Sequence, residues 1–112
     1  MNLSERNDPN VPVKLYWVDR GGSQKKIPAG VAFYEEEQGE YRLKIDMYPK
    51  VRYYLKAITT NEDKIYFRVE VLVDTYVVPQ RRVIGEGFCH PKLDRTVFME
   101  IGPHSKYLAM EY

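Results

Sequence analysis

Apolar and polar side chains alternate along residues 65–78. The odd positions of this run are apolar except for Thr75, whereas the even positions include Arg68, Glu70 and Asp74. Because side chains of a β-strand point alternately to its two faces, the run predicts one long strand with a core face and a largely wet face. It also indicates that the whole domain belongs to a β class.

Shorter runs of the same alternation predict further strands. They cover residues 11–18, 27–35, 41–47, 51–57, 83–90, 95–101 and 106–112, of which the last is short enough to be a helical turn instead. No segment has helical periodicity, and short turns join consecutive segments. We therefore expect an all-β domain, an antiparallel meander of seven or eight strands that forms a small barrel or a flattened sandwich. Gly85 and Gly87 predict a bulge or bend that lets the sheet curl.

The pairing of the three central segments follows from keeping their apolar faces together. Residues opposite each other in an antiparallel pair must share a face, so their numbers must add up to an even value. A loop at 48–50 meets this condition by placing Met47 opposite Val51, and a turn at 59–63 joins the next pair. The outer-face pairs that this register predicts are Lys56 with Tyr66, Tyr54 with Arg68, and Arg52 with Glu70.

The chain has 112 residues, a length typical of one domain. We expect the largely polar residues 1–10 to form a flexible arm and residues 11–112 to form the single domain. The arm lacks the apolar stretch of a signal peptide, and no segment approaches the ~20 apolar residues of a membrane span. The only cysteine, Cys89, allows no disulfide within the chain, so we expect a cytoplasmic protein without membrane contact.

Basic and aromatic side chains gather on the wet face of the central segments. They are Arg42, Lys44, Arg52, Tyr54, Lys56, Tyr66 and Arg68. Cations that follow a backbone and rings that stack on bases are typical of surfaces that bind single-stranded nucleic acid. The same side chains could instead bind a protein or serve only the sheet, through an Arg52–Glu70 ion pair and a Tyr54–Arg68 cation–π contact. The net charge of +1 lacks the positive excess of most non-specific nucleic-acid binders.

A second candidate surface lies at the far end of residues 65–78. Leu72, Tyr76 and Val78 give the outer face an apolar cluster there, and such clusters often mark interfaces. A second copy of the chain, in a homodimer, or a covering loop such as the N-terminal arm would each account for it.

No catalytic or metal-binding constellation emerges from the sequence. Cys89 and His90 are adjacent in a predicted strand and so point to opposite faces, and no second cysteine exists. Nothing in the pattern makes His104 a base for Cys89, so we expect an inert buried thiol. Glu35, Glu36, Glu37 and Glu40 are expected to form a solvated turn. No Asp or Glu falls at a clear interior position, and we expect no metal and no cofactor.

Large rings are expected to fill the interior. Trp17, Phe33, Tyr41, Tyr53 and Phe67 face inward in this interpretation, and five such rings can fill a small barrel. The sequence therefore favours a non-enzymatic accessory module that acts through a protein partner or a second copy of itself. Single-stranded nucleic-acid binding through the basic and aromatic face is the alternative. A small-molecule barrel is the second alternative, and it needs a cavity of about 300 Å³ or more lined by Trp17, Tyr41 or Tyr53.

Overall fold

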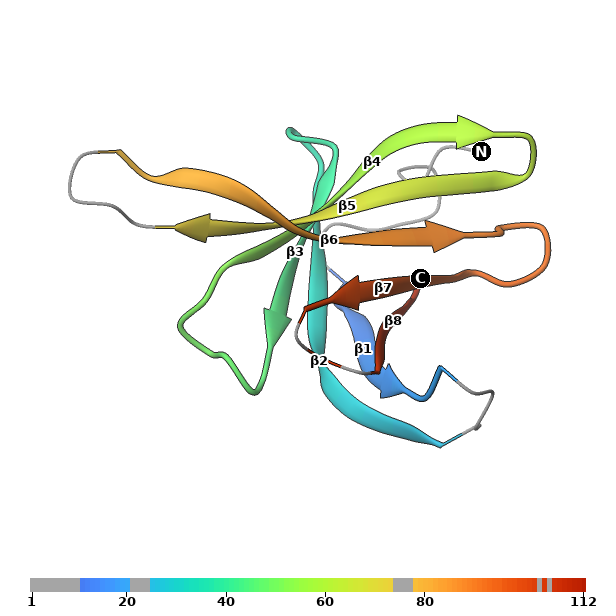
Figure 1. Ribbon diagram of the computed structural model, residues 1–112, viewed down its shortest axis with the longest axis horizontal. Coiled ribbons are helices and arrows are strands. Elements are labelled where there is room, and N and C mark those ends of the chain that lie inside the picture. Colours follow the sequence, from blue (N-terminus) through green and yellow to red (C-terminus); the bar gives the residue numbers. More distant parts are fainter. Residues whose placement is uncertain (1–10, 21–24, 74–77, 103, 105) are drawn as a thin grey trace.

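The computed structural model describes residues 11–20, 25–73, 78–102, 104 and 106–112. Its strands are β1 (Val13–Val18), β2 (Lys26–Glu35), β3 (Glu40–Ile45), β4 (Tyr53–Asn61), β5 (Lys64–Val73), β6 (Gln80–Cys89), β7 (Thr96–Ile101) and β8 (Tyr107–Glu111). Each strand pairs antiparallel with the next, and β8 pairs with β1, so the meander closes into a barrel (Figure 1). The predicted all-β meander is confirmed, and its last segment is a strand rather than a helical turn.

Two further expectations concern the predicted arm at residues 1–10 and the absence of a membrane-spanning segment. The predicted arm, residues 1–10, lies outside the described residues. Within the described ranges there is no helix, and hence none with the length and apolarity that crossing a membrane requires.

Inward-facing side chains from all eight strands fill the barrel. Trp17, Tyr41, Tyr53 and Phe67 are buried in this core, as predicted. Phe33 is not: it lies half-buried on the outer face beneath the guanidinium of Arg42, its partner across β2 and β3. The reason is that Ala32 and Tyr34, its neighbours in the chain, take the inward positions of this part of β2.

The register of β3 and β4 differs from the prediction by two residues. Leu43 lies opposite Tyr53 and Tyr41 opposite Leu55, and the strands are joined by residues 46–52 rather than by 48–50 alone. Backbone hydrogen bonds inside this longer loop, from Tyr48 N to Ile45 O at 3.0 Å and from Val51 N to Tyr48 O at 3.1 Å, explain the difference. Because the shift is even, Tyr41, Leu43, Tyr53 and Leu55 keep their predicted inward face, whereas Met47 and Val51 fall in the loop and are exposed.

The β4–β5 hairpin also pairs differently from the prediction. Its turn is only Glu62 and Asp63, and a bulge between Ala57 and Thr59 takes up one residue. Glu62 adopts a positive φ of 52°, which a tight two-residue turn requires. As a result Lys56 lies opposite Arg68 and Tyr54 opposite Glu70, so the three predicted outer-face pairs are wrong.

The glycines of β6 bend the sheet as expected. Gly85 lies opposite Val69, whereas Val83 lies opposite Glu70, so β6 has a one-residue bulge between these two pairs. A Cβ atom on Gly85 would lie 2.0 Å from the Glu100 carbonyl oxygen, so only glycine allows β6 and β7 to approach this closely. Beyond this point β5 and β6 continue as a long ribbon, seen at the left of Figure 1.

Candidate binding surfaces

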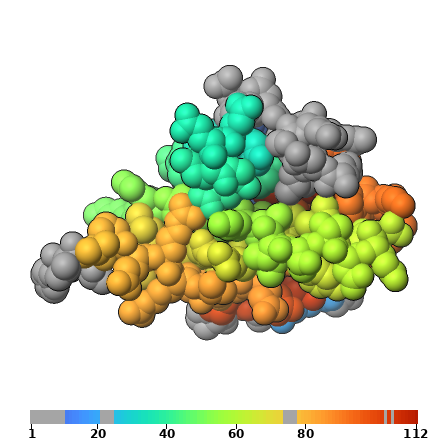
Figure 2. Space-filling model, turned by 90° about the horizontal axis from the view of Figure 1, so that it is seen from above, coloured from blue at the N-terminus to red at the C-terminus, as the bar shows by residue number. Residues whose placement is uncertain are grey.

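An ionic cluster lies on the outer face where the β2–β3 hairpin meets β6. The Arg81 guanidinium donates hydrogen bonds to both carboxylate oxygens of Glu40, at 2.8 and 2.7 Å. It also lies 3.4 Å from Glu70 Oε1 and stacks 3.7 Å from the ring centroid of Tyr54. We call these four residues the Arg81 cluster. Figure 2 shows the teal β2–β3 hairpin standing against the green to orange surface of β4, β5 and β6.

Both carboxylates of the Arg81 cluster are buried, which the sequence does not indicate. Glu40 is 4% exposed and Glu70 is 7% exposed. The prediction of a solvated turn is therefore wrong for Glu40, because its carboxylate accepts hydrogen bonds from Arg81 and is shielded from water. A buried carboxylate needs such a partner, since leaving it unpaired is costly. The hydrogen bonds that Arg81 donates to Glu40 raise the pKa of the guanidinium above its ordinary value.

Arg68 is tied to the same cluster. Its Nε lies 2.7 Å from Glu70 Oε2, as an ion pair that lacks the alignment of a hydrogen bond. Glu70 is thus held by Arg68 and Arg81, not by Arg52 as predicted. The cation over the Tyr54 ring is likewise Arg81, not Arg68. The central face does contain structural pairs of the predicted kinds, but with different members.

A basic hollow, which we call the cationic groove, lies on the outer face of β3 and β4. It has a volume of about 390 Å³ and is lined by Arg42, Leu43, Lys44, Pro49, Val51, Arg52 and Tyr54. The Arg42 side chain is fixed, because its Nε donates to Glu35 Oε1 at 2.8 Å and its guanidinium lies 4.9 Å from the Phe33 ring centroid. Lys44 and Arg52 are exposed and form no ion pair within the described ranges.

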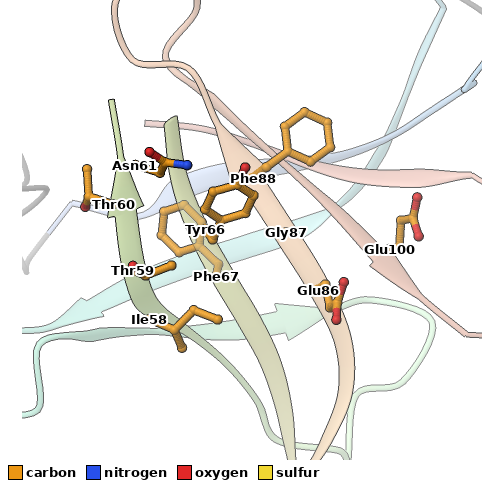
Figure 3. A pocket seen from close by; sticks show the side chains of 10 residues that line it. All are labelled: Ile58, Thr59, Thr60, Asn61, Tyr66, Phe67, Glu86, Gly87, Phe88 and Glu100. Carbon is orange, nitrogen blue, oxygen red and sulfur yellow. The ribbon is translucent and has the colours of Figure 1, made fainter. Parts of the chain in front are cut away.

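A larger hollow, which we call the aromatic groove, crosses β4, β5, β6 and β7. Its volume is about 710 Å³, and it is lined by Ile58, Thr59, Thr60, Asn61, Tyr66, Phe67, Glu86, Gly87, Phe88 and Glu100 (Figure 3). Tyr66 and Phe88 are half-buried and lie opposite each other across β5 and β6. The Lys64 ammonium lies 5.1 Å from the Tyr66 ring centroid and 4.7 Å from that of Phe88. These rings therefore already attract one cation.

Two carboxylates lie side by side at the aromatic groove. Glu86 and Glu100 are directly opposite each other across β6 and β7, and both are exposed. Glu86 forms no ion pair with any described residue, and Glu100 has only a 3.6 Å contact with the exposed Arg20. Like charges directly opposite on neighbouring strands destabilise a sheet, so this pair has no structural benefit of its own.

The end of β4 beside the aromatic groove presents an open strand edge. β3 pairs with β4 only at Tyr53, Tyr54 and Leu55, so no described strand pairs with that side of residues 56–61. All six of these residues are exposed. In the two-residue hairpin, Asn61 and Lys64 form the closing pair, which leaves the backbone N–H and C=O of Thr60 pointing away from β5.

The seven predicted binding residues do not form one surface. Arg42, Lys44, Arg52 and Tyr54 line the cationic groove, whereas Tyr66 lines the aromatic groove. Arg68 is held by Glu70, and Lys56 is exposed on β4 outside both linings. Of the predicted interface, Leu72 is half-buried, Val78 is 55% exposed, and Tyr76 lies outside the described residues.

Cys89 and the two histidines have separate surroundings. Cys89 is fully buried, and its Sγ lies 3.0 Å from the Tyr112 hydroxyl oxygen. Burial raises the pKa of this thiol, which opposes formation of the nucleophilic thiolate. His104 Nε2 lies 2.9 Å from the Tyr48 hydroxyl, and His90 lies beside the Phe88 ring. In the part of the chain that is described, no three His, Cys, Asp or Glu side chains are grouped to hold a metal ion.

The outward positions of Glu86 and Phe88 and the pairing of Arg81 with Glu40 were not predicted, although the first two had a signal in the sequence. Glu86 and Phe88 are even positions of the predicted strand 83–90, so their place on the outer face follows from alternation. The pairing of Arg81 with Glu40 had no such signal, because the two residues are 41 positions apart and on strands that are not neighbours.

Comparisons with protein-family models, curated proteins and solved structures found no match for this chain.

Proposed function

We propose that this chain is a non-enzymatic binding module. It binds an extended segment of a partner protein, which pairs as an additional strand with the open edge of β4. The observation that carries the proposal is that this edge borders the aromatic groove, the larger of the two hollows described above. A strand edge offers backbone donors and acceptors to any extended peptide, and pockets beside it select the peptide's side chains. A volume of about 710 Å³ is ample for such side chains.

Charge favours a partner segment with a basic side chain. Glu86 and Glu100 give the aromatic groove two carboxylates, and Tyr66 and Phe88 offer rings that attract cations. A Lys or Arg of the partner would relieve the repulsion between the two carboxylates and could lie against the rings. The single cysteine, which permits no disulfide within the chain, supports a reducing compartment such as the cytoplasm.

A small-molecule barrel has less support. Both hollows lie on the outer face, and neither is lined by Trp17, Tyr41 or Tyr53. These three rings are packed in the core instead. A ligand inside the barrel would have to displace them, whereas a peptide at the β4 edge displaces no described strand.

The test uses the full chain and a peptide selected on it from a random display library. Thr60→Pro removes the N–H that points away from β5, and proline is tolerated at strand edges. Thr60→Val keeps that N–H and only replaces the hydroxyl by a methyl group. We expect fluorescence anisotropy to show that Thr60→Pro weakens peptide binding at least ~10-fold, which is about 1.4 kcal/mol, whereas Thr60→Val binds as wild type. Phe88→Ala should also weaken binding, because it removes a ring of the aromatic groove.

Two results would contradict the proposal. One is that the library yields no peptide that binds the folded chain. The other is that Thr60→Pro and Thr60→Val bind the selected peptide equally well. Sedimentation of the wild type and of Thr60→Pro adds a third outcome: a dimer that only the proline variant loses would mean that the edge pairs with a second copy rather than with another protein.

A further inference from the structure

We infer that the cationic groove is a separate site that binds the phosphate group of a ligand. Three cationic side chains, Arg42, Lys44 and Arg52, line this hollow of about 390 Å³, and no carboxylate is among its described lining residues. Cations gathered in a concave surface repel one another and raise the local concentration of anions. This inference goes beyond the peptide-binding proposal, because it concerns another groove and another class of ligand.

Arg42 is the fixed part of this site. Its Nε is engaged by Glu35 at 2.8 Å, and its guanidinium plane lies over Phe33. With Nε satisfied, the two terminal nitrogens remain to donate, and a planar pair of parallel donors matches two oxygens of one phosphate. An arginine that is already oriented loses less conformational entropy when it binds.

Lys44 and Arg52 supply the charge that is not neutralised within the chain. Both are exposed, and neither has an ion-pair partner in the described segments. Arg52 is nevertheless held at its backbone, where its carbonyl oxygen accepts a hydrogen bond from Leu72 N at 2.9 Å. The groove therefore combines a fixed backbone with two side-chain cations that are free to close on an anion.

The surroundings of Tyr54 favour a phosphate over a stacked base. Arg81 stacks 3.7 Å from the centroid of this ring, so one face of the ring is already covered. Tyr66, the other ring of the predicted platform, lines the aromatic groove instead. A base-stacking surface needs exposed rings in succession. Of the predicted nucleic-acid surface, three of the five cations and a single ring line this groove, and a hollow of this volume suits a small phosphorylated group.

The test measures binding of two probes, inorganic pyrophosphate by calorimetry and a labelled oligothymidylate by fluorescence anisotropy, across a salt series. The site variant combines Lys44→Gln with Arg52→Gln. Its control combines Lys14→Gln with Arg82→Gln, which removes one lysine and one arginine from exposed positions outside both grooves. For a probe that binds the wild-type chain, we expect the site variant to bind at least ~10-fold more weakly and the control to bind with wild-type affinity. For the oligonucleotide, the slope of log affinity against log salt should fall by ~0.7 per cation removed.

A third variant, Arg42→Lys, tests the fixed guanidinium. It keeps the positive charge but loses the planar pair of donors. We therefore expect weaker pyrophosphate binding although the number of positive charges in the groove is unchanged. Pyrophosphate binding without oligonucleotide binding identifies a terminal phosphate as the ligand group, and binding of both identifies a phosphodiester backbone as well. The inference is overturned if neither probe binds at low salt, or if the control variant loses as much affinity as the site variant.

Discussion

Replacing Arg81 with methionine should destabilise the fold by about 2–3 kcal/mol. The change removes two hydrogen bonds to Glu40, at 2.8 and 2.7 Å, and the 3.4 Å contact with Glu70, while leaving both carboxylates buried. Removing one partner of a fully buried ion pair costs about 3–5 kcal/mol. The Arg81 side chain is 35% exposed, so water can enter the vacated space and solvate the carboxylates in part, which brings the expected cost down.

Urea unfolding measures this cost, and two further variants isolate its origin. Arg82→Met changes the next residue, which is exposed and forms no ion pair in the described structure, and it should alter stability by less than about 0.5 kcal/mol. Adding Glu40→Gln to Arg81→Met should restore about 1 kcal/mol or more, because a neutral amide is less costly to bury unpaired than a carboxylate. Thermal midpoints should fall by ~4 °C per kcal/mol for a domain of this size. The reasoning fails if Arg81→Met costs no more than Arg82→Met, or if the effects of Arg81→Met and Glu40→Gln simply add.

Two other predictions concern the backbone and the effect of pH. Gly85→Ala should destabilise the fold by about 2 kcal/mol or more in urea unfolding, since a Cβ would lie 2.0 Å from the Glu100 carbonyl oxygen. Gly102→Ala, where a Cβ meets nothing within 4 Å, should stay within about 0.5 kcal/mol and would rule out a general effect of the substitution if it does. Burial raises the pKa of Cys89 and of Tyr112 above their ordinary values of 9.0 and 10.0, so the folded state disfavours both deprotonated forms. Stability should therefore be unaffected by these groups below about pH 9 and should fall as the pH rises further; a flat profile up to about pH 11 would contradict this.

The faces of most strand residues, with Phe33 as an exception, could be predicted from the sequence, but the register of the central strands could not. Alternation assigns a face to each residue, and an even shift along a strand leaves that assignment unchanged. The pairing of Leu43 with Tyr53 rather than Leu55 is such a shift, so the apolar pattern alone could not exclude it. What decided the register was turn geometry: the hydrogen-bonded loop 46–52, and the two-residue turn at Glu62 and Asp63 with its nearby bulge.

The Arg81 cluster lay beyond sequence reasoning for a different reason. Glu40 and Arg81 come from β3 and β6, which are separated by two other strands in the sheet. Their contact depends on how the curled sheet brings the β2–β3 hairpin over its neighbours, and no periodicity in one dimension carries that information. The near-neutral net charge was equally uninformative, because it averages the cationic groove with Glu86 and Glu100 at the aromatic groove.

The position of the Arg81 cluster decides which variants can report on binding. Tyr54 lines the cationic groove, but it also packs against Arg81, and Arg68 is tied to the cluster through Glu70. A loss of binding in a variant of either residue would therefore be ambiguous, because the same substitution loosens contacts that hold the β2–β3 hairpin to β6. Lys44, Arg52 and Thr60 are exposed and lie outside the cluster. Substitutions there leave the described ion pairs intact, so a change in affinity at these positions reflects the grooves and the strand edge themselves.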